Sequence, residues 1–205
     1  MSLVLYYAPR STATITQLVI EELGVPCERV KVDLKKGESH SPEFLRLNPN
    51  GKVPLLVHDA TPIWESVAIT MYLGEMFGVE KDLYPAPGPR RGATMKWIAW
   101  GNVTLGETVG RWLRNTSDWT PAEQHNAKAA EVARDDMHRC LRILDQELEG
   151  KSFLVNSYTL ADTHLNSLVD WLRFLKLDFS AYANLNAWSR HCAARPAYAR
   201  VMAGA

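Results

Sequence analysis

The sequence lacks an excess of either charge and a long apolar run, and its first residues predict no secretory leader. Lys plus Arg and Asp plus Glu each number 23, so the formal net charge is zero. A nucleic-acid-binding protein usually carries a basic excess, so that class is disfavoured. No apolar run approaches the ~18 residues that a membrane span needs. The chain opens without a basic region and apolar core, which favours a cytoplasmic location.

Cysteine is also scarce. Cys27, Cys140 and Cys192 are odd in number and widely spaced. They predict neither a disulfide framework nor a cysteine-based metal site. Free cysteines of this kind are typical of a reducing compartment. The chain has no CxxC, which excludes a thioredoxin-type dithiol. The six histidines show no zinc-type spacing such as HExxH, so we expect no metal.

What is present is the composition of a soluble globular protein, with 46% apolar and 22% charged residues in 205. In the first part of the chain, apolar periodicity and turn residues predict strands and helices in the order βαβ and then ββα. This order is the thioredoxin-like arrangement, with a mixed four-stranded sheet. The predicted strands are 2–7, 28–33, 53–57 and 61–64, and the predicted helices are 12–23, 41–47 and 65–77.

A cluster of Pro and Gly then interrupts the periodicity and marks a linker. We therefore expect an α/β domain over residues 1–78, a linker over 79–89 and an all-α domain over 90–205. Beyond the linker no strand-like alternation recurs.

Cap signals divide this second half into helices. Residues 90–115 predict one long helix. Thr-Pro-Ala-Glu at 120–123 and Thr-Leu-Ala-Asp at 159–162 each predict a capping box that opens a helix. In the second box, Thr159 and Asp162 are expected to act structurally. Two further helices are predicted near the C-terminus, around 185–194 and 196–202.

In this order, four segments make the chain resemble the cytosolic glutathione transferase superfamily over nearly its whole length. The segments are Leu5-Tyr-Tyr-Ala-Pro-Arg-Ser-Thr, Asn48-Pro-Asn-Gly-Lys-Val-Pro-Leu-Leu, Glu65-Ser-Val-Ala-Ile and Tyr158-Thr-Leu-Ala-Asp. The resemblance implies a glutathione-binding first domain and a helical domain that carries the pocket for a second substrate.

The resemblance also implies how glutathione is held. Pro54 is expected to be cis, so that the backbone of Val53 can pair with the extended tripeptide. Ser66, at a helix start where an anion is favoured, would bind the γ-glutamyl carboxylate, and Glu65 would receive the ammonium. Lys52 and His40 are candidates for the glycine carboxylate.

The catalytic group must stabilise the glutathione thiolate, because a free thiol with a pKa of ~8.5 is mostly protonated at neutral pH. A hydroxyl hydrogen bond and a helix N-terminus lower that pKa. By resemblance we rank Ser11 first, Thr12 second and Tyr7 third. No cysteine stands at the head of the first helix, which argues against the classes that form a mixed disulfide there.

The expected activity is conjugation of reduced glutathione to small hydrophobic electrophiles, with glutathione as co-substrate and no separate cofactor. A homodimer and a role in detoxification follow from the resemblance. Other glutathione-dependent chemistry (isomerase, dehalogenase, peroxidase or disulfide reductase) and a non-catalytic binding module remain alternatives. Five tryptophans could line the electrophile pocket, although helix packing is the better interpretation for most: Trp97, Trp100, Trp112, Trp119 and Trp171.

Overall fold

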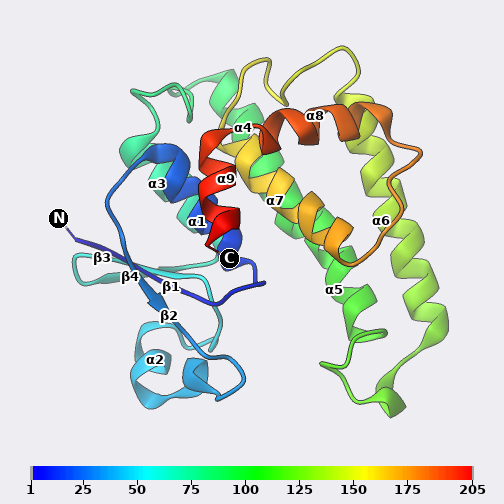
Figure 1. Cartoon of the computed structure of the whole chain (residues 1–205), viewed down its shortest axis with the longest axis horizontal. Coiled ribbons are helices and arrows are strands. Elements are labelled where there is room, and N and C mark those ends of the chain that lie inside the picture. Colours follow the sequence, from blue (N-terminus) through cyan, green and yellow to red (C-terminus); the bar gives the residue numbers. More distant parts are fainter. Residues whose placement is uncertain (1, 205) are drawn as a thin grey trace.

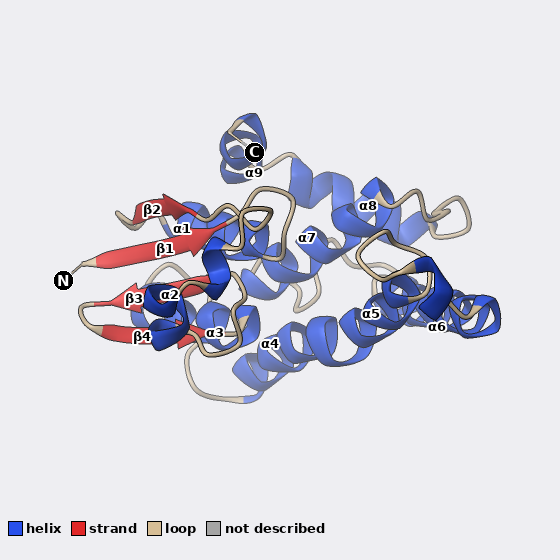
Figure 2. Ribbon diagram, turned by 90° about the horizontal axis from the view of Figure 1, so that it is seen from below, coloured by secondary structure: helices blue, strands red, loops and turns tan. Residues whose placement is uncertain are grey.

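The computed structural model describes residues 2–204 and divides into a sheet-containing part and a helical part. Figure 2 shows the strands at one end of the molecule and the long helices at the other. The sheet has four strands in the order β2-β1-β3-β4. These are β1 (Leu3–Tyr7), β2 (Glu28–Lys31), β3 (Leu55–His58) and β4 (Thr61–Trp64).

The strand directions are those of a thioredoxin-like domain. β1 pairs with β2 in parallel, which requires the crossover helix α1 (Ala13–Leu23) between them. β3 pairs antiparallel with both β1 and β4, so β3 and β4 form a hairpin. α3 (Ser66–Phe77) follows β4 directly. The expected thioredoxin-like α/β fold with a mixed four-stranded sheet is confirmed.

Local signals account for the helix boundaries in this domain. α1 ends at Gly24, which adopts the left-handed conformation that glycine tolerates best. The short helix α2 (Pro42–Leu47) begins after Ser41, whose hydroxyl accepts a hydrogen bond from the backbone N–H of Phe44, as expected for a cap followed by proline.

The second half of the described chain is helical. It contains α4 (Pro89–Trp100), the π-helical turn η2 (Gly101–Leu105), α5 (Gly106–Arg114), η3 (Ala122–Gln124), α6 (Ala127–Glu147), α7 (Leu160–Phe174), α8 (Ala183–Ala193) and α9 (Pro196–Ala203). Figure 1 shows α7 crossing the middle of the molecule. Leu165 and Val169 of α7 are fully buried, so this helix is the centre of the core.

Two helix predictions were wrong in detail. The long helix expected over 90–115 is interrupted by η2, where a π-helical turn adds a residue to the helical repeat and rotates the side chains that follow. The capping box expected at 120–123 does not form. Pro121 precedes only the short η3, and α6 begins after Asn126, whose side chain accepts from the N–H of Ala129.

The capping box at the start of α7 is confirmed. Thr159 accepts a hydrogen bond from the N–H of Ala161, and the Asp162 carboxylate accepts one from the N–H of Thr159 at 2.9 Å. Asp162 also accepts from the N–H of Leu154 and from the indole of Trp188. One fully buried carboxylate therefore ties α7 to α8 and to the preceding loop.

The two halves of the chain are joined by packing and by a partly buried ion pair. α1 contacts both α7 and α9, which Figure 1 shows lying together near the centre. Glu22 of α1 accepts two hydrogen bonds of 2.7 Å from the Arg195 guanidinium, which stacks on the ring of Tyr158. Bidentate pairs of this kind fix orientation as well as adding energy. No described helix has the length and apolar character that crossing a bilayer requires.

Candidate functional site

Three segments that are far apart in the sequence meet at one end of the sheet, where β1 and β4 finish and β3 begins. They are the start of α1, the turn before β3 and the start of α3. The Thr12 hydroxyl lies 3.4 Å from the backbone carbonyl of Val53, which joins the first two segments. The Val53–Pro54 peptide bond is cis, as expected.

The β3–β4 hairpin joins the second segment to the third. Leu55 and Trp64 are paired across it, so Pro54 and Glu65 flank the same end of the hairpin. Glu65 has a φ of 72°, uncommon for a residue with a side chain, and it is the last residue before α3. Its carboxylate is exposed and forms no ion pair with any residue that the structure describes.

Ser66 begins α3 and is 3% exposed. Free backbone N–H groups and the helix dipole favour an anion at this position. Its hydroxyl also accepts a hydrogen bond of 2.8 Å from the side-chain amide of Asn102, in the π-helical turn of the other domain. The site is therefore built by both domains.

Behind Ser66 lies a chain of three hydrogen bonds. The Asn102 amide oxygen lies 2.8 Å from Nε2 of His164, and Nδ1 of His164 lies 2.9 Å from the Thr70 hydroxyl. An amide oxygen can only accept, so Nε2 carries the imidazole proton and Nδ1 accepts from Thr70. Complete burial lowers the pKa of His164 to about 3, so the ring is neutral.

This directionality fixes the role of Ser66. In this series of hydrogen bonds each residue donates to the next one toward Ser66, whose oxygen accepts from Asn102. A hydroxyl has one proton, and that of Ser66 remains available for a ligand. The arrangement can donate a hydrogen bond to an anion at the start of α3.

Asn102 and His164 were not predicted as site residues. The sequence signals were weak: a polar residue after Gly101 in an expected continuous helix, and a histidine within a largely apolar helix face. A Cβ on Gly101 would lie 3.1 Å from side-chain atoms of Leu165 and Leu168. This glycine therefore lets α7 approach η2 closely.

The two hydroxyls at the start of α1 have different partners. Ser11 Oγ donates to the carbonyl of Ala8 at 2.7 Å and accepts from the N–H of Ala13 at 3.2 Å. The bond from Thr12 to Val53 is long at 3.4 Å, so the proton of Thr12 is held more weakly. Tyr7 lies half-buried in β1, packed against the core.

His40 and Lys52 are brought together by the turn at Gly51. Gly51 has a φ of 62°, and a Cβ there would lie 3.0 Å from Nε2 of His40, so the imidazole covers the glycine. The side chain of Asn48 donates to the carbonyl of Lys52 at 2.7 Å and stabilises the turn. The side chains of Lys52 and His40 are both exposed.

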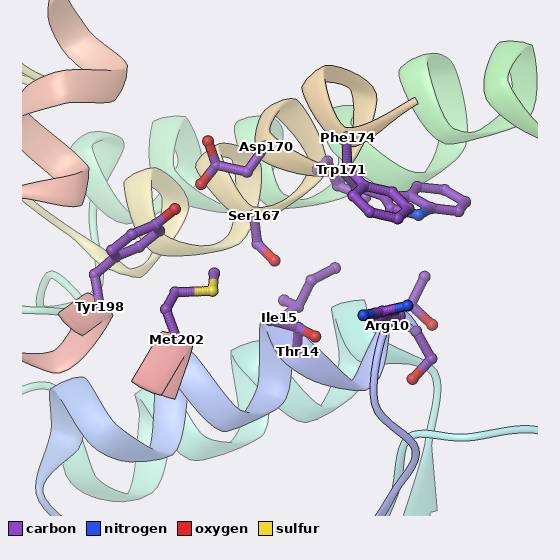
Figure 3. A pocket seen from close by; sticks show the side chains of 12 residues that line it. Arg10, Thr14, Ile15, Ser167, Asp170, Trp171, Phe174, Tyr198 and Met202 are labelled. Atoms are coloured by element: carbon purple, nitrogen blue, oxygen red, sulfur yellow. The ribbon is translucent and has the colours of Figure 1, made fainter. Parts of the chain in front are cut away.

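A cavity of about 240 Å³ opens beside Ser11 and Thr12, between α1, α7 and α9. Figure 3 shows Ile15 and Met202 on its floor and the rings of Trp171 and Phe174 on the opposite wall. At the other end Asp170 and Tyr198 face each other. Burial raises the pKa of Asp170, and it raises the pKa of the Tyr198 phenol to about 12.

Of the five tryptophans considered for the electrophile pocket, one lines this cavity. Trp171 lines it. Trp97 is 4% exposed and belongs to the core, and Trp100 and Trp112 pack against that core. Trp119 is 75% exposed. Packing was thus the correct interpretation for three of the five.

Fold and site together define a thioredoxin-like domain joined to a helical domain, with a cavity beside the start of α1. Residues 1–75 match the family described as "Glutathione S-transferase, N-terminal domain", and residues 112–196 match "Glutathione S-transferase, C-terminal domain". The chain belongs to the glutathione S-transferase family. Among the described residues, no group of three His, Cys, Asp or Glu side chains is placed to hold a metal ion.

Individual relatives and solved structures are similar to the chain over most of its length. The chain is 31% identical to glutathione S-transferase GstB of Escherichia coli K12, covering 90% of this chain and 89% of that protein. It is 32% identical to the disulfide-bond oxidoreductase YfcG of the same organism, covering 94% and 91%. The glutathione transferase URE2P6 of Phanerochaete chrysosporium, solved with oxidized glutathione, superposes with a TM-score of 0.90 at 25% identity, covering 99% and 96%.

Proposed function

We propose that this protein conjugates reduced glutathione to small hydrophobic electrophiles by thiolate attack. The observation that carries the proposal is the apolar cavity directly beside Ser11 and Thr12. Glutathione bound along Val53 would present its sulfur to this cavity. The enzyme then holds the two reactants close together, which makes the reaction effectively unimolecular.

In this proposal the two ends of glutathione are bound by different groups. Ser66 donates to the γ-glutamyl carboxylate, supported by the hydrogen bond it receives from Asn102. The exposed carboxylate of Glu65 pairs with the ammonium. Lys52 and His40, brought together at the Gly51 turn, take the glycine carboxylate.

The thiolate is stabilised by a hydroxyl at the start of α1, aided by the helix dipole. Ser11 remains the first candidate by resemblance. The longer hydrogen bond of Thr12 makes its proton easier to redirect to sulfur, which supports Thr12 as a strong second. Tyr7 remains the third candidate.

The test is a conjugation assay with a chlorodinitrobenzene and reduced glutathione, together with the ultraviolet absorbance of the thiolate in the binary complex. We expect turnover above the uncatalysed rate and a thiolate signal at neutral pH. A protein that binds glutathione but gives neither signal would be a binding module, and the proposal would fail.

Glutathione-dependent disulfide reduction is a second candidate. It is supported by the 32% identity to a relative named as a disulfide-bond oxidoreductase. No cysteine lines the cavity, so such a reaction would pass between two glutathione molecules without a mixed disulfide to the enzyme. Reduction of a small organic disulfide faster than conjugation would favour this activity.

A cytoplasmic homodimer with a role in detoxification is also proposed. Apolar side chains on β4, α3, α4 and η2 are exposed, and pairing with a second copy would cover them: Trp64, Met76, Met95 and Val103. Light scattering on the purified protein should give twice the 23.1 kDa of one chain. A monomer at all concentrations would contradict the dimer.

A further inference from the structure

Two of the 12 residues that line the cavity carry a formal charge, and they lie at opposite ends. Asp170 lies beside Tyr198, whereas Arg10 lies under the rings of Phe174 and Trp171 (Figure 3). Electrostatic selectivity in the cavity depends on which of these charges is left without a counter-charge.

The charge of Asp170 is already matched within the protein. Its carboxylate accepts hydrogen bonds from Arg173 at 3.2 Å and from Asn166 at 3.0 Å. The Tyr198 hydroxyl interacts with the same carboxylate. This end of the cavity presents no net charge to a ligand.

Arg10 has no such match. Its guanidinium lies 5.9 Å from the centre of the Phe174 ring, and no ion pair joins it to any carboxylate among the described residues. The N–H donors lie in the plane of the guanidinium, so stacking on the ring face leaves all five of them free for a ligand. The uncompensated charge of the cavity is therefore positive.

The backbone holds Arg10 in this place. Arg10 has a φ of 56°, a left-handed conformation that is unfavourable for a residue with a side chain. The turn is closed on either side by Pro9 and by the 2.7 Å hydrogen bond from Ser11 to Ala8. Strained residues of this kind cluster at binding sites, where the surrounding structure maintains them.

We propose that Arg10 is the specificity residue of the electrophile site and selects planar aromatic electrophiles that carry a carboxylate. The inference rests on the proposed conjugation activity. The aromatic ring lies against Trp171 and Phe174, and the carboxylate pairs with the Arg10 guanidinium. With an aryl chloride, the thiolate sulfur bonds to the ring carbon and chloride departs with the bonding electrons. The thiol proton goes to solvent.

Arginine suits this role for geometric reasons. A guanidinium presents parallel donors that match a carboxylate, and it stacks on an aromatic ring without losing them. Arg10 is not among the groups proposed to bind the carboxylates and the ammonium of glutathione, and it lines the cavity between α1, α7 and α9. Its substitution should therefore change discrimination between second substrates more than the affinity for glutathione.

The experiment compares a chlorodinitrobenzoate with the chlorodinitrobenzamide of the same substitution pattern. Each kcat/KM is divided by the uncatalysed rate constant with glutathione, which removes the difference in intrinsic reactivity. We expect the wild-type protein to prefer the carboxylate about tenfold on this scale. Arg10→Gln should abolish the preference, and Arg10→Lys should keep part of it. Arg190→Gln, an equal charge change on the exposed face of α8, should leave it intact.

Calorimetric titration with the unreactive dinitrobenzoate and dinitrobenzamide separates this inference from the proposed function. If neither the chlorodinitrobenzoate nor the chlorodinitrobenzamide is turned over, the conjugation proposal fails. An Arg10-dependent preference for binding the dinitrobenzoate would still support the inference. Equal normalised kcat/KM values, or equal affinities where there is no turnover, would overturn it. So would a preference that persists in Arg10→Gln.

Discussion

The side-chain amide of Asn102 donates a hydrogen bond of 2.8 Å to the hydroxyl of Ser66, across the boundary between the helical and thioredoxin-like domains. Because the Ser66 oxygen accepts this bond, its own proton is available for the γ-glutamyl carboxylate that we propose it binds. We expect Asn102→Ala to raise the Kd for glutathione about tenfold, because Ser66 would no longer be held in position for its charge-assisted hydrogen bond to that carboxylate.

The test is a double-mutant cycle in which glutathione affinity is measured by calorimetry. If Asn102 acts through Ser66, the effects of Asn102→Ala and Ser66→Ala should not add. Asn184→Ala in α8 is the matched control and should bind glutathione normally. Fully additive effects would show that Asn102 acts independently of Ser66.

Stability should depend on pH through His164. Burial lowers its pKa from the usual 6.5 to about 3, so between these values the unfolded chain takes up a proton that the folded chain does not. The stabilisation is therefore present above pH 6.5 and is lost as pH falls, by up to about 1.4 kcal/mol per pH unit. Urea unfolding from about pH 7 to pH 5 should show a steeper loss in the wild-type protein than in His164→Gln.

His191→Gln provides the control for that measurement, because His191 is exposed on α8. As the pH is lowered, the free energy of unfolding of the His191→Gln variant should fall in parallel with that of the wild-type protein. Parallel slopes for the wild-type protein and His164→Gln would mean that His164 is not the group responsible.

The thiol pKa of bound glutathione should report the hydroxyl that stabilises the thiolate. Ser11→Ala should raise this pKa by about one unit while leaving glutathione affinity nearly unchanged. The pH dependence of thiolate absorbance measures it. Thr12→Val, which keeps the side-chain shape, and Tyr7→Phe are the comparisons. A rise seen only in one of these two would assign the role to that residue instead of Ser11.

Asp162→Ala should destabilise the protein by about 3 kcal/mol or more. The substitution leaves the buried N–H groups of Leu154, Thr159 and Trp188 without their shared acceptor, and each such loss costs about 1–3 kcal/mol. Asp162→Asn keeps one acceptor oxygen and should lose less. Urea unfolding measures the change, with Asp118→Ala on the exposed α5–α6 loop as the control. A loss below about 1 kcal/mol would contradict the structural role.

Much of the fold was predictable because its signals are local. The βαβ and ββα order follows from apolar periodicity and turn residues, and the Thr159–Asp162 box marks the start of α7 within four residues of chain. The break at η2 was not predictable in the same way. Its residues favour a helix, and the π-helical turn is a change of backbone register that composition does not reveal.

The sequence by itself determined which segments are proposed to hold glutathione: the turn at Val53–Pro54, the helix start at Glu65–Ser66 and the hydroxyls at Ser11 and Thr12. Only the tertiary structure decided how Ser66 is supported and where the uncompensated charge lies. Asn102 and His164 are 62 residues apart and meet only when α7 packs on η2. Arg10 acquires its surroundings in the same way, because the rings near it come from α7. Such contacts depend on helix packing, which local sequence patterns do not encode.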